Sequence, residues 1–271
     1  MGIRDRTHAS LIDGCRLARA RTVVVPHADL DAIDTALDCV TTDRALVLTE
    51  GVYSMGGDVA PVGELVEIAH RHGALVVVDD AHGIGTVGPT GRGATEELPA
   101  SQRPDVLLGT ASKALGVEGG FACVDETLAT LMRNCARGYV FSSAPSPVVA
   151  AGVAAAVEYL RTDTRRVCSL QANVAQARLL LAEADLIPPS AAHDRGPIIR
   201  IPVGPESRAV AAQEELARRG LMVGAIRYPA VARGDAILRI CLTARHTDEH
   251  IRILVTSLRE VLDGALSDAP R

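Results

Sequence analysis

The chain has 271 residues, 48% of them hydrophobic, and a formal net charge of −5. This length suffices for one large domain or two ordinary ones with a sizeable core. Acidic and basic residues are interspersed along the sequence, which argues against nucleic acid or an anionic membrane as the main partner. The longest apolar runs, such as residues 74–78, are far too short to span a bilayer, and we expect no signal peptide, because the first residues have charge but no apolar core behind them.

The cysteines and histidines give no sign of a disulfide framework or a metal site. The six cysteines are scattered without a C-x-x-C pair, so we expect them to be reduced and mostly buried, as in a cytosolic protein. They are Cys15, Cys39, Cys123, Cys135, Cys168 and Cys241. His246 and His250 stand close together near a predicted helix start, but a zinc site needs further ligands that the sequence does not offer. We expect a soluble, cytoplasmic protein without a metal.

The first half of the chain alternates strand and helix patterns. A helix is predicted over 15–20, a strand over 21–25, a helix over 30–39 and a buried strand over 45–49. Pro61 in the first turn and Gly73 at the end bound the next helix, and residues 74–79 form another buried strand. Strand, helix and strand at this spacing predict a βαβ unit, which builds a parallel sheet with helices on its faces.

A polar tip with one lysine follows the next strand. Residues 105–110 predict a short apolar strand, and a glycine-rich exit leads from Lys113 into another strand over 120–124. Glu50, Asp79 and Lys113 all stand at carboxyl ends of predicted strands, where parallel sheets place their ligand sites. A lysine at the mouth of a buried strand loses hydration, which frees its amine to attack a carbonyl. The plainer alternative is a surface lysine on a turn, because lysine is rarely buried.

The second half has a different pattern. Helices are predicted over 128–135, 148–160 and 165–184, followed by a strand, a helix and two strands over 198–203, 207–219, 221–226 and 237–242. Thr247 caps a final helix that runs to about residue 262. This order predicts a small α+β unit. We place the boundary inside the long helices, with domains over 1–160 and 161–271.

Asp79, His82 and Lys113 fit pyridoxal 5′-phosphate chemistry. This cofactor withdraws electrons only while its ring nitrogen stays protonated, and an aspartate achieves that by charge pairing. Asp79 fits that task. His82, three residues later on the same loop, fits a bond to the ring hydroxyl. Lys113 fits the Schiff base with the cofactor aldehyde.

Five motifs in this order resemble the α-oxoamine synthases, which have the aspartate-aminotransferase fold. The motifs are Thr7-His-Ala-Ser-Leu-Ile-Asp-Gly14, Thr49-Glu-Gly-Val-Tyr-Ser-Met-Gly-Gly-Asp58, Val78-Asp-Asp-Ala-His-Gly83, Gly91-Arg-Gly93 and Thr110-Ala-Ser-Lys-Ala-Leu-Gly116. Together they are far more specific than any one alone. The resemblance runs from Thr7 to the C-terminus. It implies an α/β fold with a mostly parallel large domain, incomplete at its N-terminus, and a small C-terminal α+β domain.

The resemblance also implies roles for single residues around the cofactor. His8 corresponds to the imidazole stacked on the pyridine ring, Asp79 to the partner of the ring nitrogen and His82 to the partner of the ring hydroxyl. Thr110 corresponds to a hydroxyl that holds the cofactor phosphate, and Lys113 to the Schiff-base lysine that also moves the α-proton.

Other residues are implied on the substrate side and at the subunit interface. Ser54 and Glu50 match residues that line the substrate side of the cofactor. Arg239 resembles an arginine that grips the amino-acid carboxylate, a bidentate task suited to guanidinium, and Arg227 a second basic residue that faces the acyl substrate. Ser142 and Ser143 resemble a turn that meets the cofactor phosphate of the partner subunit in a homodimer.

The chain departs from the family pattern at several places. The family has a long segment before the His8 motif that helps to bind the phosphate and closes over the substrate, and this chain lacks it. Thr7 stands where asparagine is usual, and Ser112 where glycine is common. A phosphate without its helix N-terminus loses part of its binding energy. A mis-set gene start, a split enzyme and a decaying paralogue are the three explanations.

The resemblance implies decarboxylative condensation of an amino acid with an acyl-CoA or acyl-carrier thioester, which releases an aminoketone. The chain most resembles the 8-amino-7-oxononanoate synthases of biotin synthesis. A glycine C-acetyltransferase-like enzyme is the alternative, because one methyl group on the amino acid is a small steric difference. A truncated, non-catalytic homologue that pairs with a complete partner is another. A nucleotide-binding protein is excluded, since the glycines from Gly83 to Gly88 do not open a helix directly from a strand.

Overall fold

The computed structural model describes residues 7–42 and 44–267. The chain forms two compact units. The first comprises Met1–Ser54 and Val59–Thr164, and the second comprises Met55–Asp58 and Arg165–Arg271. A four-residue piece of the first half of the sequence therefore belongs to the second unit.

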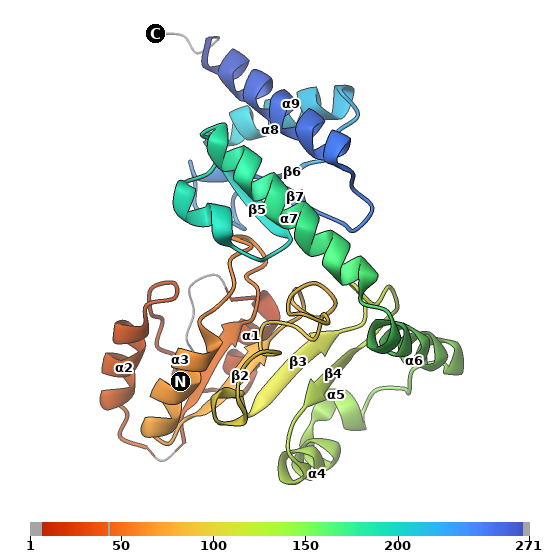
Figure 1. The fold of residues 1–271 in the computed structure, drawn as a ribbon. Helices are drawn as coiled ribbons and strands as arrows, with labels where there is room; N and C mark the ends of the chain where they lie inside the picture. Colours follow the sequence, from red (N-terminus) through yellow and green to blue (C-terminus); the bar gives the residue numbers. More distant parts are fainter. Residues whose placement is uncertain (1–6, 43, 268–271) are drawn as a thin grey trace. The chain divides into compact units, whose positions relative to one another are not determined.

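The first unit is built on a four-stranded sheet in the order β1-β2-β3-β4 (Figure 1). Its strands are β1 (Leu46–Glu50), β2 (Leu75–Asp79), β3 (Val106–Thr110) and β4 (Gly120–Cys123). The first three are parallel and β4 runs antiparallel to β3. In this register Glu50 pairs with Asp79, so the last residues of two neighbouring strands, both acidic, lie side by side.

Helices α2 (Leu30–Asp38) and α3 (Val62–Arg71) help to build the core of this unit. Asp29 caps α2 by accepting the Ala32 N–H at 2.9 Å. Helix α3 packs on β2 and on α2, and its buried side chains recur at helical spacing because one face meets the sheet. The remaining elements of this unit are α1 (Ala9–Leu17), the 3₁₀ turn η1 (Ala100–Gln102), α4 (Glu126–Cys135), α5 (Arg137–Val140) and α6 (Pro147–Thr162).

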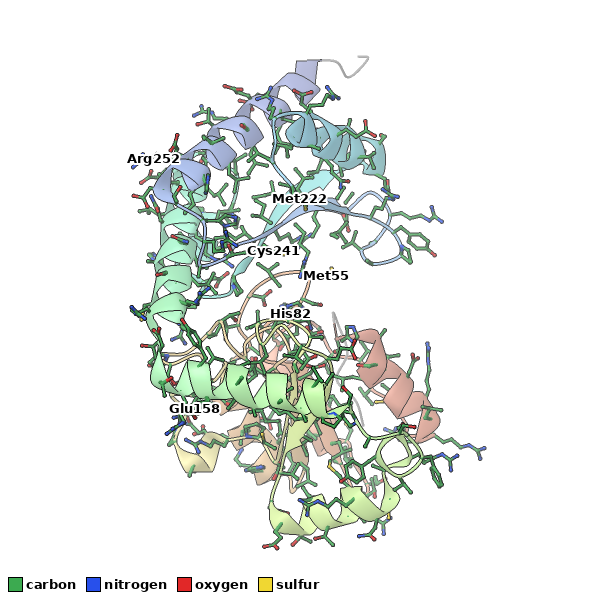
Figure 2. The ribbon with its side chains drawn as sticks, turned by 90° about the vertical axis from the view of Figure 1, so that its right-hand side faces the viewer. Met55, His82, Glu158, Met222, Cys241 and Arg252 are labelled. Carbon is green, nitrogen blue, oxygen red and sulfur yellow. The ribbon has the colours of Figure 1, made fainter. Side chains whose placement is uncertain are left out.

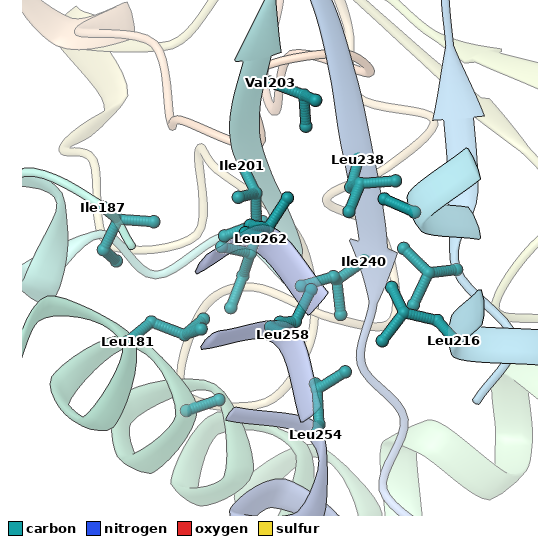
Figure 3. Close-up of a cluster of buried hydrophobic side chains, with 14 of the residues drawn as sticks. Leu181, Ile187, Ile201, Val203, Leu216, Leu238, Ile240, Leu254, Leu258 and Leu262 are labelled. Carbon is teal, nitrogen blue, oxygen red and sulfur yellow. The ribbon is translucent and has the colours of Figure 1, made fainter. Parts of the chain in front are cut away.

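The second unit has a three-stranded antiparallel sheet in the order β5-β7-β6. The strands are β5 (Ile198–Gly204), β6 (Gly224–Ile226) and β7 (Ala236–Cys241), and the helices are α7 (Arg165–Glu183), α8 (Glu206–Arg218) and α9 (Asp248–Ser267), with the 3₁₀ turn η2 (Pro189–His193). Leucines and isoleucines from α7, β5, α8, β7 and α9 interdigitate in its core (Figure 3). Each of these large side chains contributes about 1.5–3 kcal/mol by leaving water.

Arg178 on α7 is a buried cation in this second unit, only 2% exposed. Its Nη2 donates to the carbonyls of Ile198 at 2.9 Å, Gly196 at 3.0 Å and Gly57 at 3.5 Å. Its Nη1 donates to Ala191 O at 3.1 Å and lies 3.4 Å from a carboxylate oxygen of Asp194. The guanidinium therefore ties the piece at residues 55–58 to the rest of the unit.

The predicted parallel sheet and most element positions are confirmed, and three details are wrong. Arg21–Val25 is not a strand, because none of its residues pairs with another segment in the part of the chain that the structure describes, although Val25 is buried. The first helix is Ala9–Leu17, which starts at the cap formed by His8 rather than at Cys15.

The third detail concerns the cysteines. All six are free thiols, but five are exposed and Cys15 is half-buried, so the expectation of buried cysteines is wrong. Among the helices described, none is long and apolar enough to cross a membrane.

Candidate active site at the strand ends of the first unit

Glu50 at the end of β1 is a buried carboxyl, 2% exposed. Its Oε2 accepts the Ser54 N–H at 2.9 Å, and the carboxyl also accepts the backbone N–H of His8. Its Oε1 has no partner among the described residues. The pKa of Glu50 is raised to about 7, chiefly by burial; the nearby charge of Asp79 acts in the same direction, and the N–H donors act against it. Glu50 therefore holds two other predicted site residues, Ser54 and His8, by their backbones.

Asp79 at the end of β2 is half-buried. Its carbonyl accepts the Gly51 N–H at 2.8 Å, which links the ends of β1 and β2. Its Oδ1 accepts the Ala81 N–H at 3.1 Å, which orients the carboxylate. A half-buried, oriented acid beside a second acid is the type of group that can neutralise a cationic ring nitrogen.

His82 lies in the loop directly after β2 and is half-buried (Figure 2). The Thr86 hydroxyl donates to the His82 carbonyl at 2.5 Å and to the Gly83 carbonyl at 3.0 Å. These bonds fix the backbone of the turn that carries the imidazole. The sequence prediction placed His82 and Asp79 on one loop, and the structure gives that loop a defined conformation.

Thr110 and Lys113 lie at the end of β3 and in the turn that follows it. The Thr110 hydroxyl donates to Gly119 O at 3.1 Å, accepts the Ser112 N–H at 3.2 Å and lies 2.8 Å from the Ser112 hydroxyl. The Gly116 N–H donates to the Lys113 carbonyl at 3.0 Å and closes the turn. The Lys113 side chain is exposed, and Lys113 is the only lysine in the sequence.

The remaining candidates of the first unit lie on other segments. His8 is exposed at the start of α1, where its Nδ1 accepts the Ser10 N–H at 3.3 Å and lies 2.8 Å from the Ser10 hydroxyl. Ser54 is buried, 8% exposed, in the loop after β1. Ser142 and Ser143 are exposed in the loop between α5 and α6.

The two arginine candidates belong to the second unit. Arg239 is half-buried on the central strand β7, and its Nη1 lies 3.0 Å from the Cys241 sulfur. Arg227 is exposed just after β6, and its carbonyl accepts the Ala230 N–H at 3.0 Å. Among residues 7–42 and 44–267, no group of three or more His, Cys, Asp or Glu side chains could hold a metal ion.

A comparison with protein-family models gives a match over residues 3–258 to the family described as aminotransferase class I and II. The chain belongs to this family. The aminotransferase class I and II match covers both compact units and all eleven candidate residues, which are His8, Glu50, Ser54, Asp79, His82, Thr110, Lys113, Ser142, Ser143, Arg227 and Arg239.

Curated relatives of this aminotransferase-family chain include proteins of biotin synthesis. A biotin biosynthesis bifunctional protein BioWF from Cutibacterium acnes (strain SK137) is 99% identical over 97% of the chain, and the match covers 40% of that protein. A putative 8-amino-7-oxononanoate synthase from Desulfovibrio desulfuricans is 42% identical over 95% of the chain and 66% of its own length. The chain thus spans between 40% and 66% of the length of these relatives. The predicted resemblance to α-oxoamine synthases is confirmed.

Solved structures agree with this family. A serine palmitoyltransferase from S. paucimobilis with a bound PLP–myriocin aldimine matches 98% of the chain and 67% of its own length, with a TM-score of 0.90 and 29% identity. An 8-amino-7-oxononanoate synthase from Francisella tularensis matches 98% of the chain and 76% of its own, with a TM-score of 0.83 and 25% identity. The predicted aspartate-aminotransferase-like fold is confirmed.

Sequence reasoning left one buried acid without a role. Asp80 follows Asp79 directly within the motif from Val78 to Gly83. It is 0% exposed, and burial together with the charge of Asp79 raises its pKa to about 7. The signal that could have identified it is the set of glycines that surround its carboxyl, Gly51, Gly83 and Gly93.

Proposed function

We propose that this chain carries the cofactor site of a pyridoxal 5′-phosphate-dependent C-acyltransferase of the 8-amino-7-oxononanoate synthase type. The reaction joins an amino acid to an acyl-CoA or acyl-carrier thioester with loss of carbon dioxide and gives an aminoketone. The observation that carries the proposal is the order of strand ends in one sheet. Asp79 ends β2, Thr110 ends its neighbour β3, and the only lysine follows Thr110.

The residues at these strand ends fit the cofactor. Asp79 is half-buried, and Ala81 is the one described residue that donates a hydrogen bond to its carboxylate, so an oxygen is available for a ring N–H. Lys113 is exposed at a closed turn and therefore accessible to an aldehyde. Among the described residues, one oxygen of the buried Glu50 carboxyl has no hydrogen-bond partner, and a ligand could complete its hydrogen bonds on binding.

Asp79, His82 and Lys113 have separate roles in the proposed reaction. Pyridoxal phosphate, when bound, withdraws electrons from the α-carbon of an amino acid attached to it. Asp79 keeps the proton on the ring nitrogen by charge pairing, and His82 donates to or accepts from the ring hydroxyl. Lys113 Nζ would hold the cofactor through its aldehyde, and the same amine would take the α-proton of the amino acid as a general base.

His8, Thr110 and the arginines have binding roles in this proposal. His8 covers one face of the pyridine ring and keeps water from it, and the Thr110 hydroxyl binds the phosphate. Ser54 and Glu50 border the substrate side. Arg239 binds the amino-acid carboxylate through its planar guanidinium, and Arg227 faces the acyl substrate.

The proposal includes a cytoplasmic homodimer in which Ser142 and Ser143 reach the cofactor phosphate of the partner subunit. Large apolar side chains near these serines support an interface. Tyr139, Phe141 and Val148 are 67%, 75% and 81% exposed, and clustered exposed apolar groups mark binding surfaces more often than free surface. The proposal also includes a large domain over 1–160 and a small domain over 161–271.

Reductive trapping tests the cofactor site because Lys113 is the only lysine. The chain is mixed with pyridoxal phosphate, reduced with borohydride, digested and examined by mass spectrometry. The label is expected on the peptide that contains Lys113, well above the label on the N-terminal amine, and a visible absorbance band of the bound cofactor should precede reduction. In Lys113→Ala the band and the internal label should both disappear. Equal labelling of the N-terminal amine and Lys113 at saturating cofactor would contradict the proposal.

Product analysis separates the two candidate reactions. With an amino acid and an acyl thioester, the proposed activity releases carbon dioxide and an aminoketone. Alanine with the acyl thioester whose condensation gives 8-amino-7-oxononanoate is the expected pair. A preference for glycine with acetyl-CoA would favour the glycine C-acetyltransferase-like alternative, and a labelled Lys113 without either product would favour the non-catalytic homologue.

A further inference from the structure

Asp80 lies at the centre of the segments that carry the candidate site. Its backbone N–H donates to Leu108 O on β3 at 2.9 Å, and its carbonyl accepts the N–H groups of Gly83 and Ile84, both at 3.0 Å. Its Oδ2 accepts the Ala94 N–H at 2.8 Å. The loop from Ala81 to Ala94 is therefore hydrogen-bonded to Asp80 at both of its ends.

Three glycines leave space for the Asp80 carboxyl. A Cβ added at Gly51 or at Gly83 would lie 2.1 Å or 2.0 Å from Oδ1, and one added at Gly93 would lie 1.9 Å from Oδ2. Gly93 also has a φ of 96°, but Gly51 and Gly83 are not among the residues with positive φ. At these two positions the requirement for glycine comes from the space that the carboxyl occupies.

Stability alone does not explain a carboxyl at this place. Asp80 is 0% exposed, and its Oδ1 has no hydrogen-bond partner in the part of the chain that the structure describes. An unpaired buried polar atom costs about 1–3 kcal/mol, and replacing a buried charge by apolar atoms is often neutral or stabilising. What the carboxyl provides is an acceptor for Ala94 between three glycine backbones.

We propose that Asp80 is a positioning residue. It fixes Asp79, one residue before it, and His82, two residues after it, in the orientation that the pyridine ring requires. The proposal rests on the proposed function. Asp79 precedes it on the strand end, and His82 lies in the turn whose N–H groups bond to the Asp80 carbonyl. Because Oδ2 of Asp80 holds the loop end at Ala94, the turn that carries His82 is restricted to one conformation.

The electrostatics agree with this role. The pKa of Asp80 is raised to about 7, chiefly by burial; the charge of Asp79 acts in the same direction, and the N–H groups of Ala94 and Gly83 act against it. Asp79, the preceding residue, is the charged group that acts on the Asp80 carboxyl. A substantially protonated Asp80 leaves Asp79 as the carboxylate that pairs with the ring nitrogen.

Hydrogen exchange tests the hold on the loop without any cofactor. In Asp80→Ala the amides of His82 and Ala94 should exchange at least about tenfold faster than in the wild type, while Asp80→Asn, which keeps an acceptor of the same shape, should restore most of the protection. Asp105→Ala is the matched control, because Asp105 also accepts a backbone N–H, that of Val76, at 2.7 Å. Equal protection of His82 and Ala94 in Asp80→Ala and in Asp105→Ala would overturn the proposal.

The absorbance of the cofactor tests the orientation of Asp79. After loading with pyridoxal phosphate, Asp80→Ala should shift the pH midpoint of the visible band, and Asp80→Asn should return it toward the wild-type value, whereas Asp105→Ala should leave it in place. An unchanged midpoint in Asp80→Ala would overturn the positioning role. If the wild type shows no band, the proposed function fails, and the exchange measurement still decides whether Asp80 fixes the loop.

A glycine substitution covers the case in which Asp80→Ala does not fold. Gly83→Ala alone should lower the melting temperature and the protection of His82, because its Cβ meets the carboxyl. Gly83→Ala combined with Asp80→Asn should have the same low melting temperature and protection, since asparagine fills the same space. Gly83→Ala combined with Asp80→Ala should recover both. Gly14→Ala is the control, because nothing lies within 4 Å of its added Cβ. If Gly83→Ala lowered the melting temperature and the protection equally in the wild type, in Asp80→Asn and in Asp80→Ala, the carboxyl would not be held between these glycines.

Discussion

Glu50 shows how one buried acid makes folding depend on pH. The Glu50 carboxyl is 2% exposed and accepts the N–H groups of Ser54 and His8, with Asp79 as the charged neighbour. Its pKa rises from an ordinary value of 4.5 to about 7 on folding. An acid with a raised folded pKa stabilises the fold fully below its unfolded pKa, and this stabilisation is lost as the pH rises through the folded value.

Glu50→Gln should therefore flatten the pH profile of stability. Between about pH 4.5 and pH 7 the wild type should lose up to about 3 kcal/mol of unfolding free energy that the variant keeps, since each unit of pKa shift corresponds to about 1.4 kcal/mol. Urea titrations of both proteins at pH 5, 6, 7 and 8 measure the difference. Parallel profiles over this range would show that Glu50 is ionised in the folded chain near pH 5.

The residue types at the site could be predicted because their chemistry is specific, but their environments could not. Asp79, His82 and Lys113 form a recognisable set at predicted strand ends. Asp79 and Asp80 are the same residue type in adjacent positions, and only the packed loop decides that one is half-buried and the other fully buried. The glycines around the Asp80 carboxyl are Gly83 and Gly93 of the loop after β2 and Gly51 of the segment after β1, so the pattern next to either acid does not show that all three meet at Asp80.

At the scale of the element, Arg178 on α7 joins that helix to a turn of the first half of the sequence by its bond to Gly57 O. The Arg178 side chain donates to four carbonyls, and burial lowers the pKa of its guanidinium while Asp194 and Asp58 raise it. It remains a cation, because even the lowered value of an arginine stays far above neutral pH. Removing this cation leaves the carbonyls and the Asp194 carboxylate without their donor.

Arg178→Met should destabilise the second unit by about 3–5 kcal/mol, the usual loss when one partner of a buried ion pair is removed. Urea unfolding followed by circular dichroism measures it. Arg166→Met on the same helix is the matched control, because Arg166 is exposed and exposed substitutions change stability by less than about 0.5 kcal/mol. Equal losses in the two variants would show that the carbonyls do not depend on Arg178.

Helices and parallel strands were predictable from their periodicity, and the errors occurred where tertiary pairing decides. Residues 21–25 have the composition of a strand, but a strand forms only when a neighbour takes its hydrogen bonds. The start of α1 was missed because histidine is not a usual cap, whereas the start of α9 was found, and there Thr247 accepts the His250 N–H at 3.3 Å.

At the scale of the whole molecule, the division into units is not contiguous in sequence. Residues 55–58 cluster with 165–271, although they follow β1 directly. Composition and periodicity predict only domain boundaries that divide the sequence into consecutive parts. They therefore cannot predict that residues 55–58 belong to the unit that starts at Arg165. Gly57 makes this possible, because its φ of 76° and its closeness to Ile198 O exclude a side chain there.

The core of the second unit predicts that a fragment of residues 165–271 folds by itself. Every buried residue of this core lies between Leu170 and Leu262, so the fragment keeps the whole cluster. Of the carbonyls that Arg178 contacts, the fragment loses the weakest, Gly57 O at 3.5 Å. We therefore expect dispersed amide resonances and a single cooperative thermal transition, with an unfolding enthalpy of roughly 60–80 kcal/mol for a domain of this size.

The control for this fragment is Leu216→Asp, which buries a charge at a fully buried position and should abolish the transition. A peptide of residues 51–62 added in excess should raise the melting temperature of the fragment by restoring the Gly57 contact, since any ligand that binds only the folded state stabilises it. A fragment with the spectrum of an unfolded chain, even with the peptide present, would mean that this core depends on the first unit.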